Sequence, residues 1–370
     1  MQFIDLEAQQ KRIRSKIEEN IMKVFDHGRY IMGPEIEELE RKLADYVAIR
    51  YAVGVGSGTD ALLISLLANR IGPLDAIFTS PFTFIATAEV IQLLGATPVF
   101  VDIESDTYNM DPQKLESTVR KVESEGKLNP RGIIPVDIFG QAVDYDEICS
   151  IAREYDLFVL EDAAQSFGGS YKGKKTCSLA DIAATSFFPA KPLGAYGDGG
   201  MIFTDDKEMF DQLISIRVHG KGSYKYENDR VGINGRLDTI QAAILLAKFT
   251  IFSEEIELRQ EVAERYNLGL KDYVRIPFVK KHNISAWAQY SVLHPRRDKI
   301  IEDLKTEGIP SAIYYPIPLH LQKAFSHLGY RPGDFPVSEK VCKEIFSLPM
   351  YPYLEPDKQK KIIDCIHRYV

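Results

Sequence analysis

Three short stretches of the sequence hold residue types that could do chemistry together, and the first centres on a lysine. Lys191 lies in residues 189–194 (PAKPLG), between two prolines and directly after an apolar stretch. Because proline fixes the backbone, we expect a stiff loop here. If burial or a nearby cation lowers the pKa of this amine, its uncharged form can attack an aldehyde and form an imine. For this residue taken alone, an inert, solvent-exposed lysine is the simpler interpretation.

The second stretch is the glycine-rich run at residues 54–60 (GVGSGTD), which follows an apolar run and precedes an expected helix. Glycines let the backbone approach an anion, and a helix N-terminus offers free N–H groups and partial positive charge. The run therefore suits a phosphate group, with a plain tight turn as the alternative. It matches the dinucleotide fingerprint G-x-G-x-x-G only in part, because Thr59 stands where the third glycine should be.

The third stretch is residues 158–165 (FVLEDAAQ), an apolar run that ends in an acid. In open α/β sheets, ligands bind at the carboxyl ends of the strands, so Asp162 is expected where chemistry takes place. The alternative is a helix N-cap, a position at which Asp is favoured for structural reasons alone.

Taken together, these stretches fit one ligand better than three coincidences. Pyridoxal 5'-phosphate needs a phosphate site, a carboxylate facing its ring nitrogen and a lysine at its aldehyde. Asp162 and Lys191 are far enough apart in sequence for the chain to return to the same edge of a sheet. We therefore predict a pyridoxal-phosphate site that includes both residues.

The elements around these stretches alternate between strand and helix. This order predicts an α/β fold with a mainly parallel central sheet covered on both faces. Strands are expected at residues 51–55, 77–78, 98–101, 132–136, 157–160, 183–188 and 201–204. Crossover helices are expected at residues 60–70, 86–94 and 145–155.

The pattern changes after Gly235. Residues 237–265 have helical character and are expected to form one long helix or two, leading to a second domain. We predict a large domain over 1–249, with an N-terminal segment at 1–20, and a smaller C-terminal α+β domain over 250–370. The expected elements of the small domain are strands at 286–293 and 313–315 and helices at 299–307, 336–346 and 356–369.

Composition excludes several classes of protein. A net charge of −8, from 45 basic and 53 acidic residues, argues against a nucleic-acid binder. No apolar run is long enough to span a membrane, and the first residues lack the apolar stretch of a secretory signal, so we expect a cytoplasmic protein without a membrane partner. The four scattered cysteines show no zinc-ligand spacing, so no metal site is expected.

Motifs along nearly the whole chain resemble the DegT/DnrJ/StrS family of pyridoxal-phosphate nucleotide-sugar aminotransferases. They include FIDLEAQQ, GSGTDAL, PFTFIAT, EDAAQSFG, SFFPAKPLG and YYPIPLHLQ. The resemblance implies the aspartate-aminotransferase-like fold (fold type I) and pyridoxal 5'-phosphate as the cofactor. It also implies a homodimer with shared active sites.

The resemblance assigns roles around the cofactor ring. Lys191 would be the catalytic residue, which bonds to the cofactor's aldehyde and moves a proton between two carbons. Asp162 would face the ring nitrogen, and Gln165 would lie beside the phenolic oxygen. Phe84 would stack on the ring.

The same resemblance assigns the phosphate and substrate contacts. Gly58, Thr59, Asp60 and Ser186 would hold the phosphate, and Asn234 would reach the phosphate of the neighbouring subunit. The residues expected to contact the substrate are Arg236, Tyr314, Tyr315 and His320. A buried structural role is the alternative for each of those four. Tyr314 stands where the family often has a histidine, which would alter sugar contacts.

Within the family, the motifs look most like enzymes that aminate carbon 3 of a UDP-linked 2-acetamido-3-oxo-glucuronic acid. The donor would be L-glutamate, released as 2-oxoglutarate. The product would serve surface polysaccharide (O-antigen, lipopolysaccharide) synthesis.

Several other functions stay open at this point. One is amination at carbon 3 or carbon 4 of a dTDP- or UDP-linked keto-6-deoxy sugar. A sugar dehydratase would have histidine in place of Lys191, and a non-catalytic regulator would leave the intact lysine and aspartate unexplained. A nicotinamide-dependent dehydrogenase is suggested by the glycine-rich run alone.

Overall fold

The central sheet of the computed structural model, which describes residues 1–224 and 226–370, has seven strands in the order β1-β9-β8-β5-β4-β2-β3. Adjacent strands in this sheet are parallel, except that β9 runs antiparallel to both β1 and β8. The sheet is therefore mainly parallel, as predicted. Its strands are β1 (Tyr51–Val55), β2 (Asp75–Thr79), β3 (Thr97–Phe100), β4 (Asn129–Ile134), β5 (Phe158–Asp162), β8 (Ile182–Ser186) and β9 (Gly200–Thr204).

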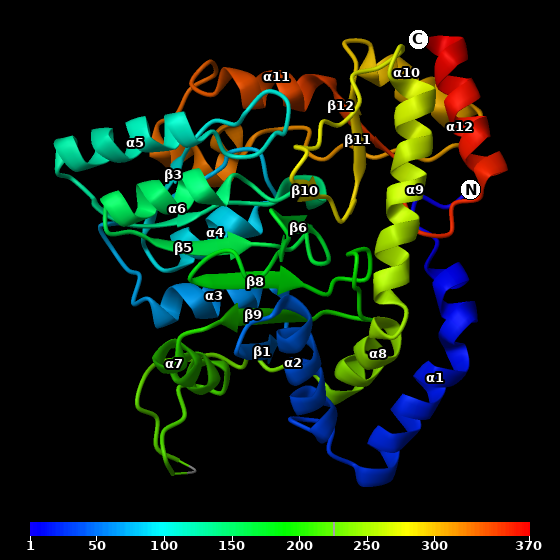
Figure 1. Cartoon of the computed structure of the whole chain (residues 1–370). Helices are drawn as coiled ribbons and strands as arrows, with labels where there is room; N and C mark the ends of the chain where they lie inside the picture. Colours follow the sequence, from blue (N-terminus) through cyan, green and yellow to red (C-terminus); the bar gives the residue numbers. More distant parts are fainter. Residues whose placement is uncertain (225) are drawn as a thin grey trace.

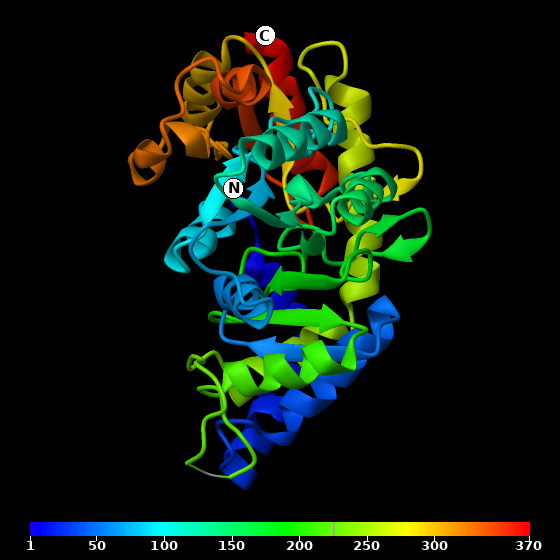
Figure 2. The same ribbon diagram turned by 90° about the vertical axis from the view of Figure 1, so that its left-hand side faces the viewer.

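Helices cover both faces of this sheet, as Figures 1 and 2 show. Side chains along each strand alternate between the two faces, and most of them are buried, which is why these strands are so apolar. The helices of this part are α1 (Leu6–His27), α2 (Pro34–Val47), α3 (Gly58–Ala68), α4 (Ala86–Leu93), α5 (Pro112–Glu125), α6 (Tyr145–Glu154), α7 (Lys207–Arg217) and α8 (Thr239–Phe249).

Strand register brings the glycine-rich run and the lysine loop to one edge of the sheet. Val55, the last residue of β1, pairs with Gly200, and so does Ser186, the last residue of β8. Asp162 ends the next strand and pairs with Ala184. The three stretches that the sequence singles out therefore lie at the ends of strands β1, β5 and β8, at the same edge of the sheet.

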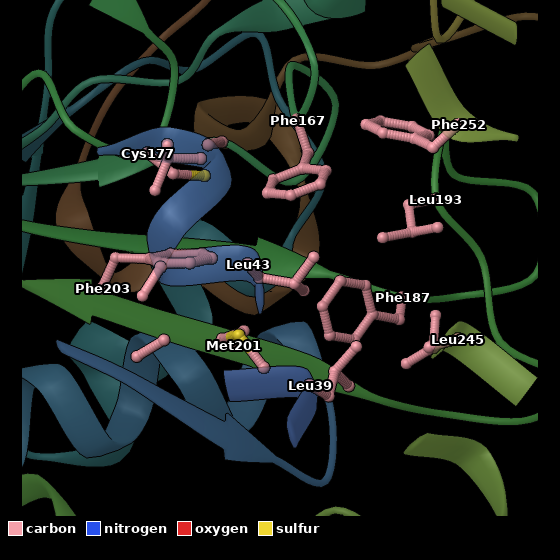
Figure 3. Packing of buried hydrophobic residues seen from close by; sticks show 14 of the residues in the cluster. Leu39, Leu43, Phe167, Cys177, Phe187, Leu193, Met201, Phe203, Leu245 and Phe252 are labelled. Atoms are coloured by element: carbon pink, nitrogen blue, oxygen red, sulfur yellow. The ribbon is translucent and has the colours of Figure 1, made fainter. Parts of the chain in front are cut away.

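A buried apolar cluster fixes the start and end of the lysine loop. Phe187 and Leu193, on either side of Lys191, are almost completely buried and pack among residues of α2, α8 and α9, with Leu39 and Leu245 close by (Figure 3). Burial of two large apolar side chains stabilises this loop by about 1.5 to 3 kcal/mol each. The loop is therefore held in place by the core.

The C-terminal part has its own apolar cluster, which begins at Val262 and includes residues up to Ile366. Helix α9 (Phe252–Leu270) contributes to this cluster and to the one beneath the sheet, and Figure 1 shows it running between the two regions. The split into 1–249 and 250–370 stays a prediction that these clusters support. The other elements are β6 (Ser170–Tyr171), β7 (Lys174–Lys175), β10 (Asn283–Ile284), β11 (Tyr290–Leu293), β12 (Ile345–Leu348), α10 (Arg297–Thr306), α11 (Pro336–Glu344) and α12 (Pro356–Tyr369), with short 3-10 turns at Ile138–Gly140, Leu319–Leu321 and Lys323–Leu328.

Three expectations for this part need correction. Residues 313–315 form no strand, because the nearby Pro310, Pro316 and Pro318 have no N–H group to donate to a neighbouring strand. The pairing in this segment is an isolated bridge between Ala312 and Ser347. The helix expected to reach 346 ends at Glu344, since the next residues pair antiparallel with β11. The strand expected at 286–293 starts only at Tyr290.

The helical region at 237–265 proves to be two helices, α8 and α9, with a break at Thr250 and Ile251. Across residues 1–224 and 226–370, none of the helices combines the length and the apolar character that crossing a membrane requires.

Candidate active site

Lys191 is half-buried in the loop that follows β8. Burial lowers the pKa of its amine to about 8, and the negative charge of Asp162 opposes this shift. The loop is tight, because its Gly194 approaches the carbonyl oxygen of Pro189 so closely that a Cβ atom would lie 2.4 Å from it. The lowered pKa leaves about a tenth of the amine uncharged at pH 7, far more than for an ordinary lysine, and the uncharged form is the nucleophile.

Asp162 is 4% exposed at the end of β5. Its Oδ2 accepts a hydrogen bond from Thr87 Oγ1 at 2.8 Å, and its Oδ1 accepts one from the backbone N–H of Ala164 at 3.2 Å. Burial raises the pKa of Asp162, and these bonds and the positive charge of Lys191 oppose the rise. A turn, not a helix, follows Asp162, so the N-cap interpretation is wrong.

The glycine-rich run forms the N-terminus of α3. Ser57 is the N-cap and accepts a hydrogen bond from Asp60 N at 3.0 Å, and the first N–H groups of the helix have no partner within it. A Cβ atom at Gly58 would lie 2.7 Å from Cβ of Ser186. These contacts bring Gly58, Thr59, Asp60 and Ser186 together around an N-terminus suited to an anion.

Gln165 connects the site to the C-terminal part. Its Oε1 accepts from the backbone N–H of Phe139 at 2.8 Å, and its Nε2 donates to the hydroxyl of Tyr315 at 3.3 Å. The ring of Phe84 lies 6.4 Å from that of Tyr315 and is 55% exposed. A large aromatic side chain left exposed offers a face on which a flat ring can stack.

The structure does not bring all the expected residues together. His320 has a fully buried side chain, lies 3.2 Å from Glu339 and packs on the ring of Phe335, so it has no face open to a substrate. Asn234 is exposed and pairs with Val218, and no contact among residues 1–224 and 226–370 joins it to Lys191.

Arg236 and Tyr314 are both half-buried near the site's margins. Nε of Arg236 is buried and has no hydrogen-bond partner among residues 1–224 and 226–370. Tyr314 packs against Phe3, and burial raises the pKa of its hydroxyl.

Sequence reasoning missed Thr87 and the residues behind Asp162. Thr87 follows Phe84 by three residues, a spacing that could have indicated two side chains on the same side of this segment. Behind Asp162 lies Asp137, which is fully buried and accepts from Ser166 Oγ, Tyr145 Oη and the backbone N–H of Val143. Burial raises the pKa of Asp137 well above its usual value.

Glu161 is a second fully buried carboxyl group in this region, and it accepts from the backbone N–H groups of Cys177 and Leu179. Burial, followed by the charge of Asp137, raises the pKa of Glu161. Within the part of the chain that the structure describes, no three His, Cys, Asp or Glu side chains are placed to hold a metal ion.

Known proteins resemble the chain over nearly its full length. It is 49% identical to the UDP-2-acetamido-2-deoxy-3-oxo-D-glucuronate aminotransferase of Pseudomonas aeruginosa, over 96% of each chain. It matches the crystal structure of a DegT/DnrJ/EryC1/StrS aminotransferase from Brucella abortus with a TM-score of 0.98 and 50% identity, over 100% and 99% of the two chains.

A third relative is the crystal structure of NtdA from Bacillus subtilis with bound cofactor PMP, which matches with a TM-score of 0.88 and 28% identity, over 99% and 83% of the chains. The profile of the DegT/DnrJ/EryC1/StrS aminotransferase family matches residues 11–367. This chain therefore belongs to the DegT/DnrJ/EryC1/StrS aminotransferase family.

Proposed function

We propose that this protein is a pyridoxal-phosphate enzyme that transfers the amino group of L-glutamate to a nucleotide-linked keto sugar. The substrate we favour is a UDP-linked 2-acetamido-3-oxo-hexuronic acid, aminated at carbon 3. The observation that carries this proposal is the placement of Lys191, Asp162 and the α3 N-terminus at one sheet edge, in a chain 49% identical to an aminotransferase of that name.

The residues present fit pyridoxal phosphate. Gly58 leaves room beside Ser186 that a Cβ atom would fill, at the N-terminus of a helix where a phosphate is favoured. Phe84 offers an open aromatic face, and Asp162 is a buried carboxylate that can pair with a protonated ring nitrogen. Bound there, the cofactor would supply an aldehyde and an electron-accepting ring.

Three side chains of the protein would have separate roles toward this cofactor. Nζ of Lys191, with its lowered pKa, would hold the cofactor through its aldehyde with loss of water, and once the amine of a substrate displaced it, the freed Nζ would move a proton between substrate atoms. Asp162 would hold a proton at the ring nitrogen, and Thr87 keeps that carboxylate oriented. Gln165 can place its amide beside the phenolic oxygen, since its Nε2 already faces the hydroxyl of Tyr315.

We extend the proposal to a homodimer with shared sites. Asn234 is exposed, no contact among the described residues joins it to Lys191, and the first N–H groups of α3 have no partner within that helix. An exposed amide that a second copy brings to this end would add a donor to the phosphate. Arg236, two residues further on, has a buried Nε without a described partner and could bind an anionic part of the substrate.

The choice among sugars rests on the relative's name and not on a contact within this chain. Tyr314, Tyr315 and Arg236 are our proposed substrate contacts, and the buried His320 is left out. Cytoplasmic location and a role in surface polysaccharide or O-antigen synthesis stay predictions.

The test is to run the reaction in reverse with UDP- and dTDP-linked 3-amino and 4-amino sugars and 2-oxoglutarate. We expect glutamate to form from the UDP-linked 3-amino uronic acid. If only a 4-amino sugar gives up its nitrogen, the enzyme is a carbon 4 aminotransferase. If none does and the protein carries no cofactor, the proposal fails.

A further inference from the structure

A buried ion pair contacts the glycine-rich run, and none of the roles above uses it. Nη1 of Arg217, at the end of α7, lies 2.5 Å from Oε1 of Glu40 in α2. The side chain of Arg217 is 4% exposed and that of Glu40 is 17% exposed. Burial raises the pKa of the Glu40 carboxyl group, and the positive charge of Arg217 opposes this rise. The two charges therefore compensate each other away from solvent.

Both members of the pair bond to the backbone of Gly54, the first residue of the run. Oε1 of Glu40 accepts from the N–H group of Gly54 at 2.7 Å, and Nη1 of Arg217 donates to its carbonyl oxygen at 2.9 Å. Gly54 lies in β1, the edge strand of the central sheet, and α2 and α7 both pack against this strand (Figure 1). Every second residue of an antiparallel strand points its N–H and C=O groups away from the partner strand. At Gly54 the ion pair satisfies both groups.

The backbone of Arg217 holds the run at a second point. Its carbonyl oxygen accepts from the N–H group of Gly235 at 3.0 Å, and the carbonyl oxygen of Gly235 accepts from the N–H group of Gly56 at 3.0 Å. Arg217 is therefore bonded to Gly54 through its side chain and to Gly56 through Gly235. Helix α3 begins at Gly58, two residues further on. These bonds fix the segment that leads into the α3 N-terminus.

Stability alone does not account for a charged pair at this position. Apolar side chains of similar volume in place of a buried ion pair often leave a protein equally stable or more stable, because two charges lose their hydration on burial. A charged pair differs from such a replacement in that its hydrogen bonds have fixed lengths and directions. The bonds of Glu40 and Arg217 end on the backbone of the run that is expected to bind a phosphate.

We propose that Glu40 and Arg217 are positioning residues for the cofactor's phosphate: they hold residues 54–56 where the first N–H groups of α3 can bind it. This inference rests on the proposed function and adds to it two side chains that act through the backbone, without touching the ligand. Binding groups must be held within about 0.5 Å of their working geometry, and supporting hydrogen bonds provide that precision.

The affinity for pyridoxal phosphate, compared with that for pyridoxal, tests this role. Both aldehydes can bond to Lys191, so the ratio of their Kd values reports the contribution of the phosphate. The double variant Glu40→Leu with Arg217→Met removes the pair and leaves neither charge unpaired. In it, the Kd for pyridoxal phosphate should rise at least about tenfold and that for pyridoxal should change less than about twofold. Spectroscopic titration of the full-length, cofactor-depleted protein gives both values.

The pair of Arg131 and Asp75 offers a matched control. Nη1 of Arg131 lies 3.6 Å from Oδ1 of the buried Asp75, whose Oδ2 accepts from the backbone N–H of Gly72 at 3.0 Å. This pair also bonds to a glycine backbone, but it lies where β2 and β4 begin, opposite the strand ends that carry the site. Asp75→Leu with Arg131→Met should leave the ratio of the two Kd values within about twofold of that of the unmodified protein.

Arg217→Lys provides a second variant if the double variant does not fold. It keeps the charge beside Glu40, but the shorter side chain lacks the planar guanidinium that reaches Glu40 and Gly54 together. The Kd ratio should then fall at least about threefold.

The ratio in the folded variant decides the inference. An unchanged ratio, including an equal rise in both Kd values, refutes the positioning role, because the pair would then only stabilise the fold. If neither aldehyde bonds to Lys191 in the unmodified protein, the proposed function is refuted instead.

Discussion

Thr87 Oγ1 donates a 2.8 Å hydrogen bond to Oδ2 of Asp162, joining the first turn of α4 to the end of β5. The bond lowers the pKa of a carboxyl group that burial pushes up. It also fixes the carboxylate plane in the site. The ionised state of Asp162 therefore depends on a residue that the sequence motifs did not single out.

Removal of this bond should weaken the enzyme most at low pH. In Thr87→Val the pKa of Asp162 rises further, so the acidic limb of the kcat/KM profile should move to higher pH and the maximum should fall about tenfold, in line with loss of one charged hydrogen bond. Thr118→Val, on the half-buried face of α5, is the control and should leave the profile unchanged. A profile for Thr87→Val that coincides with that of the unmodified enzyme would refute the role of Thr87.

Lys191 should be indispensable to amino transfer. In Lys191→Ala we expect formation of 2-oxoglutarate from glutamate to fall by about 10³-fold or more, because the substitution removes the amine that would bond to the aldehyde. Borohydride reduction followed by peptide mass analysis should find the cofactor on the 189–194 segment of the unmodified protein. Cofactor found on the exposed Lys172 instead would contradict this assignment.

Gly58 should be needed for cofactor binding. In Gly58→Ala the new methyl group meets Cβ of Ser186 at 2.7 Å, so Ser186 or the α3 N-terminus must shift. The Kd for pyridoxal phosphate, from spectroscopic titration, should rise about tenfold. Gly72→Ala, whose Cβ meets no atom within 4 Å, is the control and should bind the cofactor normally.

Stability should fall as the pH rises because of Asp137. Its pKa is raised by burial from 3.8 to about 7, so the folded state favours the protonated form. This contribution to the free energy of unfolding is complete below about pH 4 and is lost as the pH rises through about 7. Denaturant titrations of Asp137→Asn should show a weaker fall over that range, whereas the exposed Asp26→Asn should behave like the unmodified protein.

Subunit mixing should reveal whether Asn234 acts across a dimer. Lys191→Ala and Asn234→Ala proteins are each expected to be inactive at limiting cofactor. In a heterodimer, one site then carries both substitutions and the other carries neither, so a random equal mixture should regain about a quarter of the unmodified activity. No recovery would mean that Asn234 serves its own chain or has no role in the site.

The sequence by itself determined the chemistry of this protein. Lys191, Asp162 and the glycine-rich run are recognisable because a reactive lysine, a ring carboxylate and a phosphate site each need particular residue types next to strand ends. The family motifs that surround them gave the fold, and the strands were located within a few residues because buried parallel strands are continuous apolar runs.

Only the tertiary structure decided which residues meet. Thr87 and Asp162 are far apart in sequence, as are Gln165 and Tyr315, and no local pattern encodes those pairs. The same holds for His320, whose sequence context suggested a substrate contact although its side chain packs against Phe335. Burial and charge compensation depend on every neighbour that surrounds a side chain, so they are properties of the folded chain.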